Sequence, residues 1–130
     1  MLIQAIGNYI IHLLAGLAMV GVFVTIYLRV TPFCEITLIR QGCVAAAVSL
    51  AGATLGFSLT VASSILHSDN FIMFVTWGTC AMIVQVLAYA VLARALPNME
   101  QQLSENNVAM GSLMGLTSVV VGIINAACLS

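Results

Sequence analysis

The side chains that could do chemistry are few in this chain of 130 residues. The seven formal charges are Arg29, Glu35, Arg40, Asp69, Arg94, Glu100 and Glu105. The four cysteines have no C-x-x-C spacing and the two histidines are far from them in sequence, which argues against a metal site. No Ser-His-acid set, phosphate loop or pair of carboxylates within an apolar run is present. We therefore predict a protein that is not an enzyme, with no metal, no cofactor and free thiols.

Four polar residues lie inside otherwise apolar segments. Asn8 and His12 are four residues apart, and Gln85 and Asn125 belong to later segments. A histidine titrates near physiological pH and is able to relay protons, although such a residue more often bonds to a neighbouring helix. We expect the side chains of Gln85 and Asn125 to form hydrogen bonds with neighbouring helices, and each bond to contribute about 0.6 to 2 kcal/mol of stability.

The composition determines where such residues must lie. The chain is 62% hydrophobic and 5% charged, whereas a soluble domain carries about 25% charged residues. An ordinary soluble domain is thereby excluded, and a net charge of −1 with only three arginines argues against nucleic-acid binding. The sequence predicts an all-α integral membrane protein in direct contact with the lipid bilayer.

Four apolar segments have the length of about 20 residues that a bilayer requires. They run over about 9–28, 43–66, 71–93 and 108–128. We expect a helix in each, because a backbone in lipid must satisfy its hydrogen bonds within the segment. The first segment follows no basic residue and is long, so we interpret it as a retained helix and not as a signal peptide. The whole of 1–130 is then one membrane domain.

The three arginines predict the orientation of the chain. They fall in the loops 29–42 and 94–107, whereas the short turn at 67–69 and both termini carry no lysine or arginine. The positive-inside rule then places both loops in the cytoplasm and both termini on the periplasmic side.

An internal repeat relates the two halves, about 1–66 and 67–130. The pattern R-x-x-P-x-x-E-x-x-L begins at Arg29 and returns 65 residues later at Arg94. Its remaining members are Pro32 and Glu35 in the first copy and Pro97 and Glu100 in the second. This repeat predicts two tandem helical hairpins in parallel topology, related by an axis along the membrane normal.

Within each copy, proline suits the first turn of a helical lead-in, and the glutamate would lie near its positive end. Thr31 would cap the first lead-in, and Asn106 and Asn107 would cap the last segment. We favour an anchoring role for the repeated charges over direct chemistry.

Small residues recur on the second and fourth segments. The glycines are Gly52, Gly56, Gly111, Gly115 and Gly122. Such spacing lets helix backbones approach closely. Packing of the second segment on the fourth and self-association of subunits both remain open from this pattern.

Three groups of residues together resemble a known family. They are Thr31-Pro32-x-x-Glu35-x-x-Leu38-Ile39, Trp77-Gly78 followed by Gln85, and Asn107-x-Ala109-x-Gly111 with Gly122-x-x-Asn125-Ala126-Ala127. The chain resembles the YjfL-like family of small bacterial inner-membrane proteins, known as domain of unknown function 350. The resemblance covers nearly the whole chain. One departure is Gly42-Cys43, where family members often carry asparagine in the second position.

The resemblance implies a four-helix protein of two tandem repeats in the bacterial inner membrane, with no settled activity. It also implies a role in envelope maintenance or stress, because the usual genomic neighbours include phage-shock-type membrane-remodelling proteins and polyamine-ligase-like enzymes. A phage-shock-type protein is accordingly the peripheral partner that the resemblance suggests.

Two functions are compatible with these features. The first is a homo-oligomeric scaffold that presents Glu35, Arg40, Glu100 and Glu105 on its cytoplasmic loops to a peripheral partner. The alternative is a channel for cations, protons or small solutes, formed by the oligomer. Its pore would be lined by Asn8, His12, Gln85 and Asn125.

Overall fold

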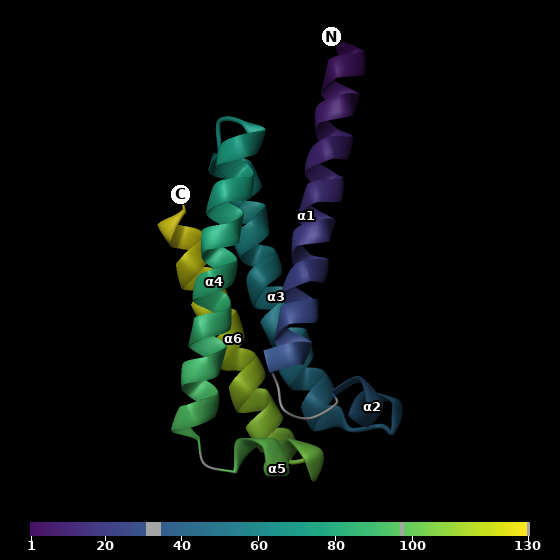
Figure 1. Cartoon of the computed structure of the whole chain (residues 1–130), viewed down its shortest axis with the longest axis vertical. Helices are drawn as coiled ribbons and strands as arrows, with labels where there is room; N and C mark the ends of the chain where they lie inside the picture. Colours follow the sequence, from purple (N-terminus) through teal and green to yellow (C-terminus); the bar gives the residue numbers. More distant parts are fainter. Residues whose placement is uncertain (31–34, 97, 130) are drawn as a thin grey trace.

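The computed structural model describes residues 1–30, 35–96 and 98–129, and all the regular structure within these ranges is helical. The helices are α1 (Leu2–Val30), α2 (Glu35–Arg40), α3 (Val44–His67), α4 (Phe71–Ala95), α5 (Met99–Ser104) and α6 (Val108–Cys128). Helices α1, α3, α4 and α6 are long and apolar enough to cross a membrane (Figure 1). The predicted all-α membrane class is confirmed.

Helix α1 is longer than the sequence predicted. It begins at Leu2, whereas the expected segment began at about Tyr9. The predicted segment covered only the length that a bilayer core requires, whereas the helix continues through Leu2 to Asn8 before it. At a rise of about 1.5 Å per residue, α1 is about 43 Å long and exceeds the bilayer core of about 30 Å. It must therefore tilt or project beyond the core.

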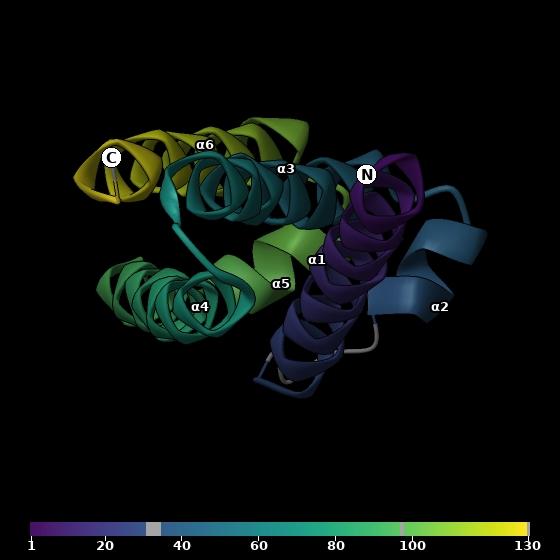
Figure 2. The same cartoon turned by 90° about the horizontal axis from the view of Figure 1, so that it is seen from above.

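Helices α3 and α6 form the most closely packed pair. Their backbones touch where the glycines face each other, so that a Cβ atom added at Gly52 would collide with Gly115, and one added at Gly122 would collide with Gly56. Figure 2 shows these two helices side by side, with α4 in a second row and α1 crossing obliquely.

An aromatic cluster attaches the second half of α1 to α3 and α4. The Phe23 and Phe57 rings stack with centroids 4.7 Å apart, and the Tyr27 and Tyr89 rings lie 4.5 Å apart. The Tyr27 hydroxyl also shares a hydrogen bond of 2.9 Å with the hydroxyl of Ser49 on α3. Phe23, Tyr27 and Phe57 are buried almost completely, so this end of α1 is fixed.

The first half of α1 has little contact with the other helices. Its large apolar side chains from Leu2 to Leu17 are exposed, and the helix extends beyond the bundle (Figure 1). His12 attaches it to α4, with its ring stacked on Phe74 at 5.6 Å, and Gly16 is buried beside Val61 of α3.

The two ends of the bundle differ in their connections. Both termini and the turn between α3 and α4 lie at one end, and the short helices α2 and α5 lie at the other (Figure 1). In the turn, the Asn70 side chain accepts a 2.8 Å hydrogen bond from Met73 N and so caps α4.

The predicted lead-ins to α3 and α6 are separate short helices. A turn at Gln41 and Gly42 separates α2 from α3, and a turn at Glu105 and Asn106 separates α5 from α6. Glu35 is the first residue of α2 and Glu100 the second of α5, close to the expected first turn. The predicted roles of Thr31, Pro32 and Pro97 fall outside the described residues.

Candidate functional site

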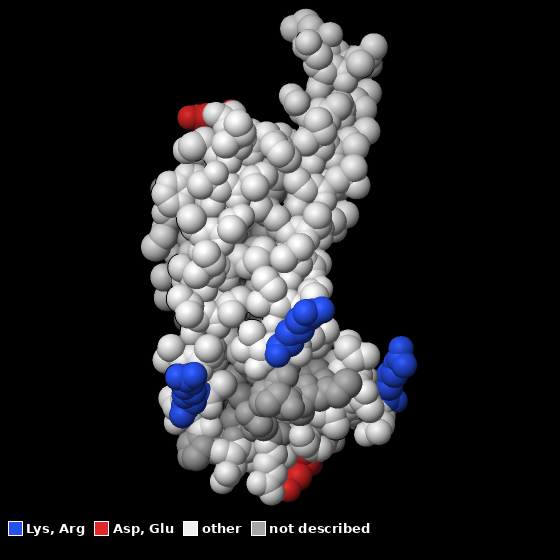
Figure 3. Space-filling view, viewed as in Figure 1, with Lys and Arg blue, Asp and Glu red and all other residues white. Residues whose placement is uncertain are grey.

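The three arginines gather at one end of the molecule. Arg29, Arg40 and Arg94 occupy the last turns of α1, α2 and α4, and all three are exposed. Figure 3 shows them at about one level, near the short helices. Asp69 lies at the opposite end, in the turn between α3 and α4. This end, which also carries Glu105, is the candidate functional site, and we call it the arginine end.

The first short helix ends in a tight, glycine-dependent turn. Gly42 has a positive φ of 86°, its N–H donates to Ile39 O, and the N–H of Cys43 donates to Leu38 O. This is the Schellman arrangement, in which a residue in the left-handed region lets the last carbonyls of a helix find donors.

The same turn follows the second short helix, 64 residues later. Asn106 has a φ of 61°, its N–H donates to Leu103 O, and the N–H of Asn107 donates to Gln102 O. Asparagine adopts this backbone conformation more readily than other residues with a side chain. The two turns have one geometry, which accords with the repeat expected from the sequence.

The two turns are also bonded to each other. The Asn106 side chain accepts a 3.0 Å hydrogen bond from Ala45 N, in the first turn of α3. The Cys43 thiol donates to Leu103 O at 3.1 Å, and Leu103 is completely buried. Cys43 makes no capping bond with its own side chain, so Asn106 from the second half caps α3 in its place. We call these four residues the turn junction.

The expected role of one of the two asparagines is wrong. Asn107 does cap α6, since its side chain accepts from Met110 N at 3.3 Å. Asn106 was predicted to cap the same helix, but its positive φ turns the side chain toward α3. A local sequence pattern does not report a cap that acts across 61 residues.

We expect Asn106→Ala to cost about 2 kcal/mol of unfolding free energy, because it removes a cap and places alanine in the left-handed region. Asn106→Gly is the matched control: it also removes the cap but tolerates that backbone, and should cost about 1 kcal/mol. Unfolding titrations in detergent micelles measure both. A glycine variant as stable as the original protein would contradict the capping role.

Two of the polar residues predicted inside the membrane join α4 to α6. The Gln85 amide donates to Ser118 O at 2.9 Å, and the Asn125 amide donates to Ala81 O at 3.1 Å. Both are hydrogen bonds between helices, as the sequence predicted. Gln85 is only 2% exposed, so it lies inside the bundle.

The other two polar residues, Asn8 and His12, lie on the first half of α1. We call this half the free half, because it has few contacts with the other helices. Asn8 is exposed, and its backbone carbonyl oxygen lies 2.7 Å from His12 Nδ1. Both residues line a pocket of about 470 Å³ with Tyr9 and Ile65. The structure thus places Gln85 and Asn125 at the contact between α4 and α6, and Asn8 and His12 on the first half of α1. The pore that these four residues would line in an oligomer stays a prediction.

Neighbouring backbones fill the space around the predicted glycines. Besides the two pairs described above, a Cβ at Gly111 would collide with Ala45 of α3. These glycines serve packing within the chain, and they are too buried to receive a second subunit in this conformation.

The cysteines lie apart from one another. Cys43, Cys80 and Cys128 are free thiols, and Cys34 is outside the described residues. In the part of the chain that the structure describes, no three His, Cys, Asp or Glu side chains gather as they would around a metal ion.

Comparison with known proteins provides the family. The model of the family described as Domain of Unknown Function (DUF350) matches residues 1–129. The chain belongs to the DUF350 family. It is 31% identical over 115 residues to the UPF0719 inner membrane protein YjfL of Escherichia coli strain K12, which covers 88% of this chain and 87% of that protein. YjfL of Escherichia coli O157:H7 matches with the same values. No solved structure matches the chain.

DUF350 membership confirms the resemblance found in the sequence. With its four apolar helices, the chain is a multi-pass inner-membrane protein of a family whose function is unknown. In this DUF350 protein, the hydrogen bonds of the turn junction hold together the end at which the arginines lie.

Proposed function

We propose that this protein is a non-enzymatic, homo-oligomeric module of the inner membrane that presents its arginine end to a peripheral protein in the cytoplasm. The observation that carries the proposal is the separation of charge: all three arginines and Glu105 lie at the end formed by α2 and α5. A role in envelope maintenance or stress is part of the proposal.

The construction of the arginine end supports a docking role. The hydrogen bonds of the turn junction hold the turns after α2 and α5 in one relative position. Arg40 and Glu105 are exposed beside these turns. A rigid surface with charges of both signs favours specific association, because electrostatic complementarity selects the partner and fixes its orientation.

The free half of α1 supports self-association. Its side chains from Leu2 to Leu17 have few contacts within the chain, and Gly7 has open space around it. Helices in lipid associate through close packing, and an uncovered glycine permits a close approach. The glycines of α3 and α6 already pack against each other's backbones within the chain, so we assign the subunit contact to α1.

The partner that we propose is a phage-shock-type membrane-remodelling protein, as the family resemblance implies. Such a partner would meet the arginine end at the membrane surface, where Arg40 and Glu105 are exposed. The positive-inside rule places that surface in the cytoplasm.

The test is a charge reversal at the arginine end. We expect Arg40→Glu with Glu105→Lys to reduce co-purification of the phage-shock-type protein from native membranes at least about tenfold, since like charges at an interface cost several kcal/mol. Asp69→Lys, at the opposite end, is the matched control and should have no effect. Native mass spectrometry of the purified protein should show an oligomer with either variant.

The proposal would be overturned if the purified protein were a monomer and the charge-reversal variant co-purified as much of the phage-shock-type protein as the original does. Proton or cation flux through liposomes containing the oligomer, abolished by His12→Ala, would instead favour the channel. The exposed position of Asn8 and the pocket beside His12 are the observations in favour of that alternative.

A further inference from the structure

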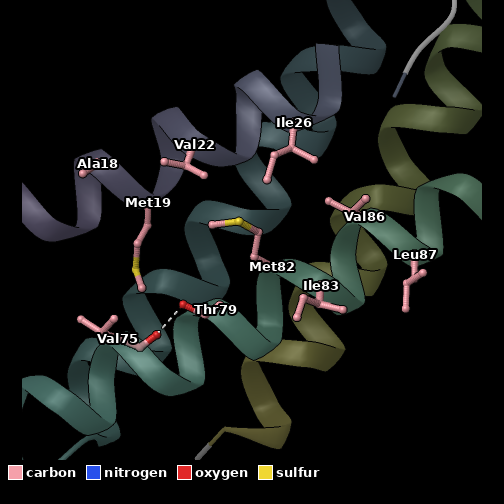
Figure 4. Close-up of a pocket in the computed structure, with 10 residues that line it drawn as sticks. All are labelled: Ala18, Met19, Val22, Ile26, Val75, Thr79, Met82, Ile83, Val86 and Leu87. Carbon is pink, nitrogen blue, oxygen red and sulfur yellow. Dashed lines mark hydrogen bonds between the residues drawn. The ribbon is translucent and has the colours of Figure 1, made fainter. Parts of the chain in front are cut away.

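A groove of about 540 Å³ between α1 and α4 gives a ligand little to recognise (Figure 4). Thr79 is the one residue with a polar side chain among the described residues that line it. Its hydroxyl already donates to Val75 O of its own helix at 2.8 Å. The groove therefore offers almost only apolar contacts, and a polar group that still needs a partner lies elsewhere, between α4 and α6.

The side-chain amide of Gln85 has a fixed orientation inside the bundle. Its Nε2 donates to Ser118 O at 2.9 Å, and a backbone carbonyl can only accept, so the amide oxygen must point away from that carbonyl. Gln85 is 2% exposed, and within the described part of the chain its Oε1 has no hydrogen-bond partner. Such an atom is costly in a membrane-spanning helix, because lipid supplies no donor.

A small cavity between α4 and α6 lies against this residue. It is lined from α4 by Gln85, Ala88 and Tyr89 and from α6 by Thr117 and Ser118, among others. Its volume is about 10 Å³, in the measure by which a site for one water takes about 10 to 15 Å³. One water fits this space, and a larger ligand does not.

The cavity also carries the groups that a water molecule needs. A buried water makes about three hydrogen bonds. Gln85 Oε1 is an acceptor, and Thr117 and Tyr89 each carry a hydroxyl that can donate or accept. None of the described residues that line the cavity is charged, so nothing there would offset the charge of a metal ion. The cavity thus suits an uncharged donor of hydrogen bonds.

The cavity lies deep in the membrane. At a rise of about 1.5 Å per residue, Gln85 is about 14 Å along α4 from Arg94, which lies in the last turn of that helix. Half of the bilayer core is about 15 Å thick. A water at Gln85 is therefore far from bulk solvent and must be held by the protein.

We propose that this cavity is a binding site for one water molecule that joins α4 to α6. The water donates to Gln85 Oε1 and bonds to the Thr117 hydroxyl, with the Tyr89 hydroxyl as a further partner. Both ends of the Gln85 amide are then bonded to α6, one directly and the other through water. The proposal requires the membrane-spanning fold but not the proposed docking function.

Water-edited solid-state NMR of the full chain in lipid bilayers tests the site. In this measurement, magnetisation passes from water protons to the protein protons nearest to them. We expect the Gln85 side-chain amide to receive this signal at the shortest mixing times. The reference is the backbone amide of Ala53 on α3, a residue that is 1% exposed and should receive signal only by slow diffusion through the protein.

Two pairs of variants locate the water. Ala88→Leu fills the cavity and should remove the early signal at Gln85. Ala90→Leu is the matched control, because Ala90 is also half-buried on α4 but lies outside the cavity. Thr117→Val keeps the size of the side chain but removes the hydroxyl, and should weaken the early signal. Thr79→Val is its control, since the Thr79 hydroxyl bonds within α4.

Three results would overturn the proposal. The first is a signal that reaches the Gln85 amide no earlier than the Ala53 amide. The second is an early signal that persists in Ala88→Leu, which would place the water outside the cavity. The third is an equal signal in Thr117→Val and Thr79→Val, which would exclude the bridge to α6.

Discussion

Gly115→Leu should cost about 3 kcal/mol of unfolding free energy, which is large for a single substitution. A Cβ at this position would lie 2.6 Å from the carbonyl oxygen of Val48, an atom of the α3 backbone that has no alternative rotamer. Helices α3 and α6 would have to separate. Hydrogen bonds that cross this interface would then weaken, among them the 2.6 Å bond from the Ser63 hydroxyl to Ala126 O.

Gly21→Leu is the matched control for this substitution. Gly21 also lies in a membrane-spanning helix, but nothing lies within 4 Å of the Cβ that it would gain. We expect this variant to unfold within about 0.5 kcal/mol of the original protein. Steric-trapping measurements in bicelles give both values. Equal destabilisation by the two variants would contradict the contact between the α3 and α6 backbones.

Phe57→Ala should cost about 3 kcal/mol and release the second half of α1. The Phe57 side chain is fully buried, and its ring stacks on Phe23 of α1 at 4.7 Å. Without the ring, a cavity opens between α1 and α3, and the main remaining attachments of this half are Tyr27 and its partners Ser49 and Tyr89.

Distance measurements between spin labels report the release. Labels at Leu17 on α1 and Leu55 on α3, both exposed, should give one distance in the original protein and a broad distribution in Phe57→Ala. Trp77→Ala is the control, because Trp77 is 46% exposed on α4 and should leave the distribution narrow. A narrow distribution in both variants would show that α1 does not depend on the aromatic cluster.

The helices themselves could be predicted from the sequence because their signal is local. Long apolar runs interrupted by charges determine where a helix can cross lipid, and α6 begins and ends where the runs predicted, at Val108 and Cys128. The start of α1 was missed because the predicted segment was limited to the length that crosses a bilayer core, whereas the helix begins at Leu2.

Contacts between distant segments were harder to predict. The glycine spacing indicated close packing, but a glycine accepts a backbone from its own chain or from another equally well. Only the structure assigns Gly52 to Gly115 and Gly56 to Gly122. The four polar residues show the same limit. The sequence placed them within apolar segments, but only the structure shows that Gln85 and Asn125 join α4 to α6 and that Asn8 and His12 lie on the first half of α1.

The bond from Ala45 N to the Asn106 side chain has a consequence for the order of assembly. Because the chain is synthesised from its N-terminus, α3 is made before residue 106, so the side chain that caps its first turn is missing until the second half has been synthesised. A polypeptide that stopped after the first hairpin would never complete that turn by itself. In the folded protein, α3 in the first half therefore depends on a side chain from the second half for its cap.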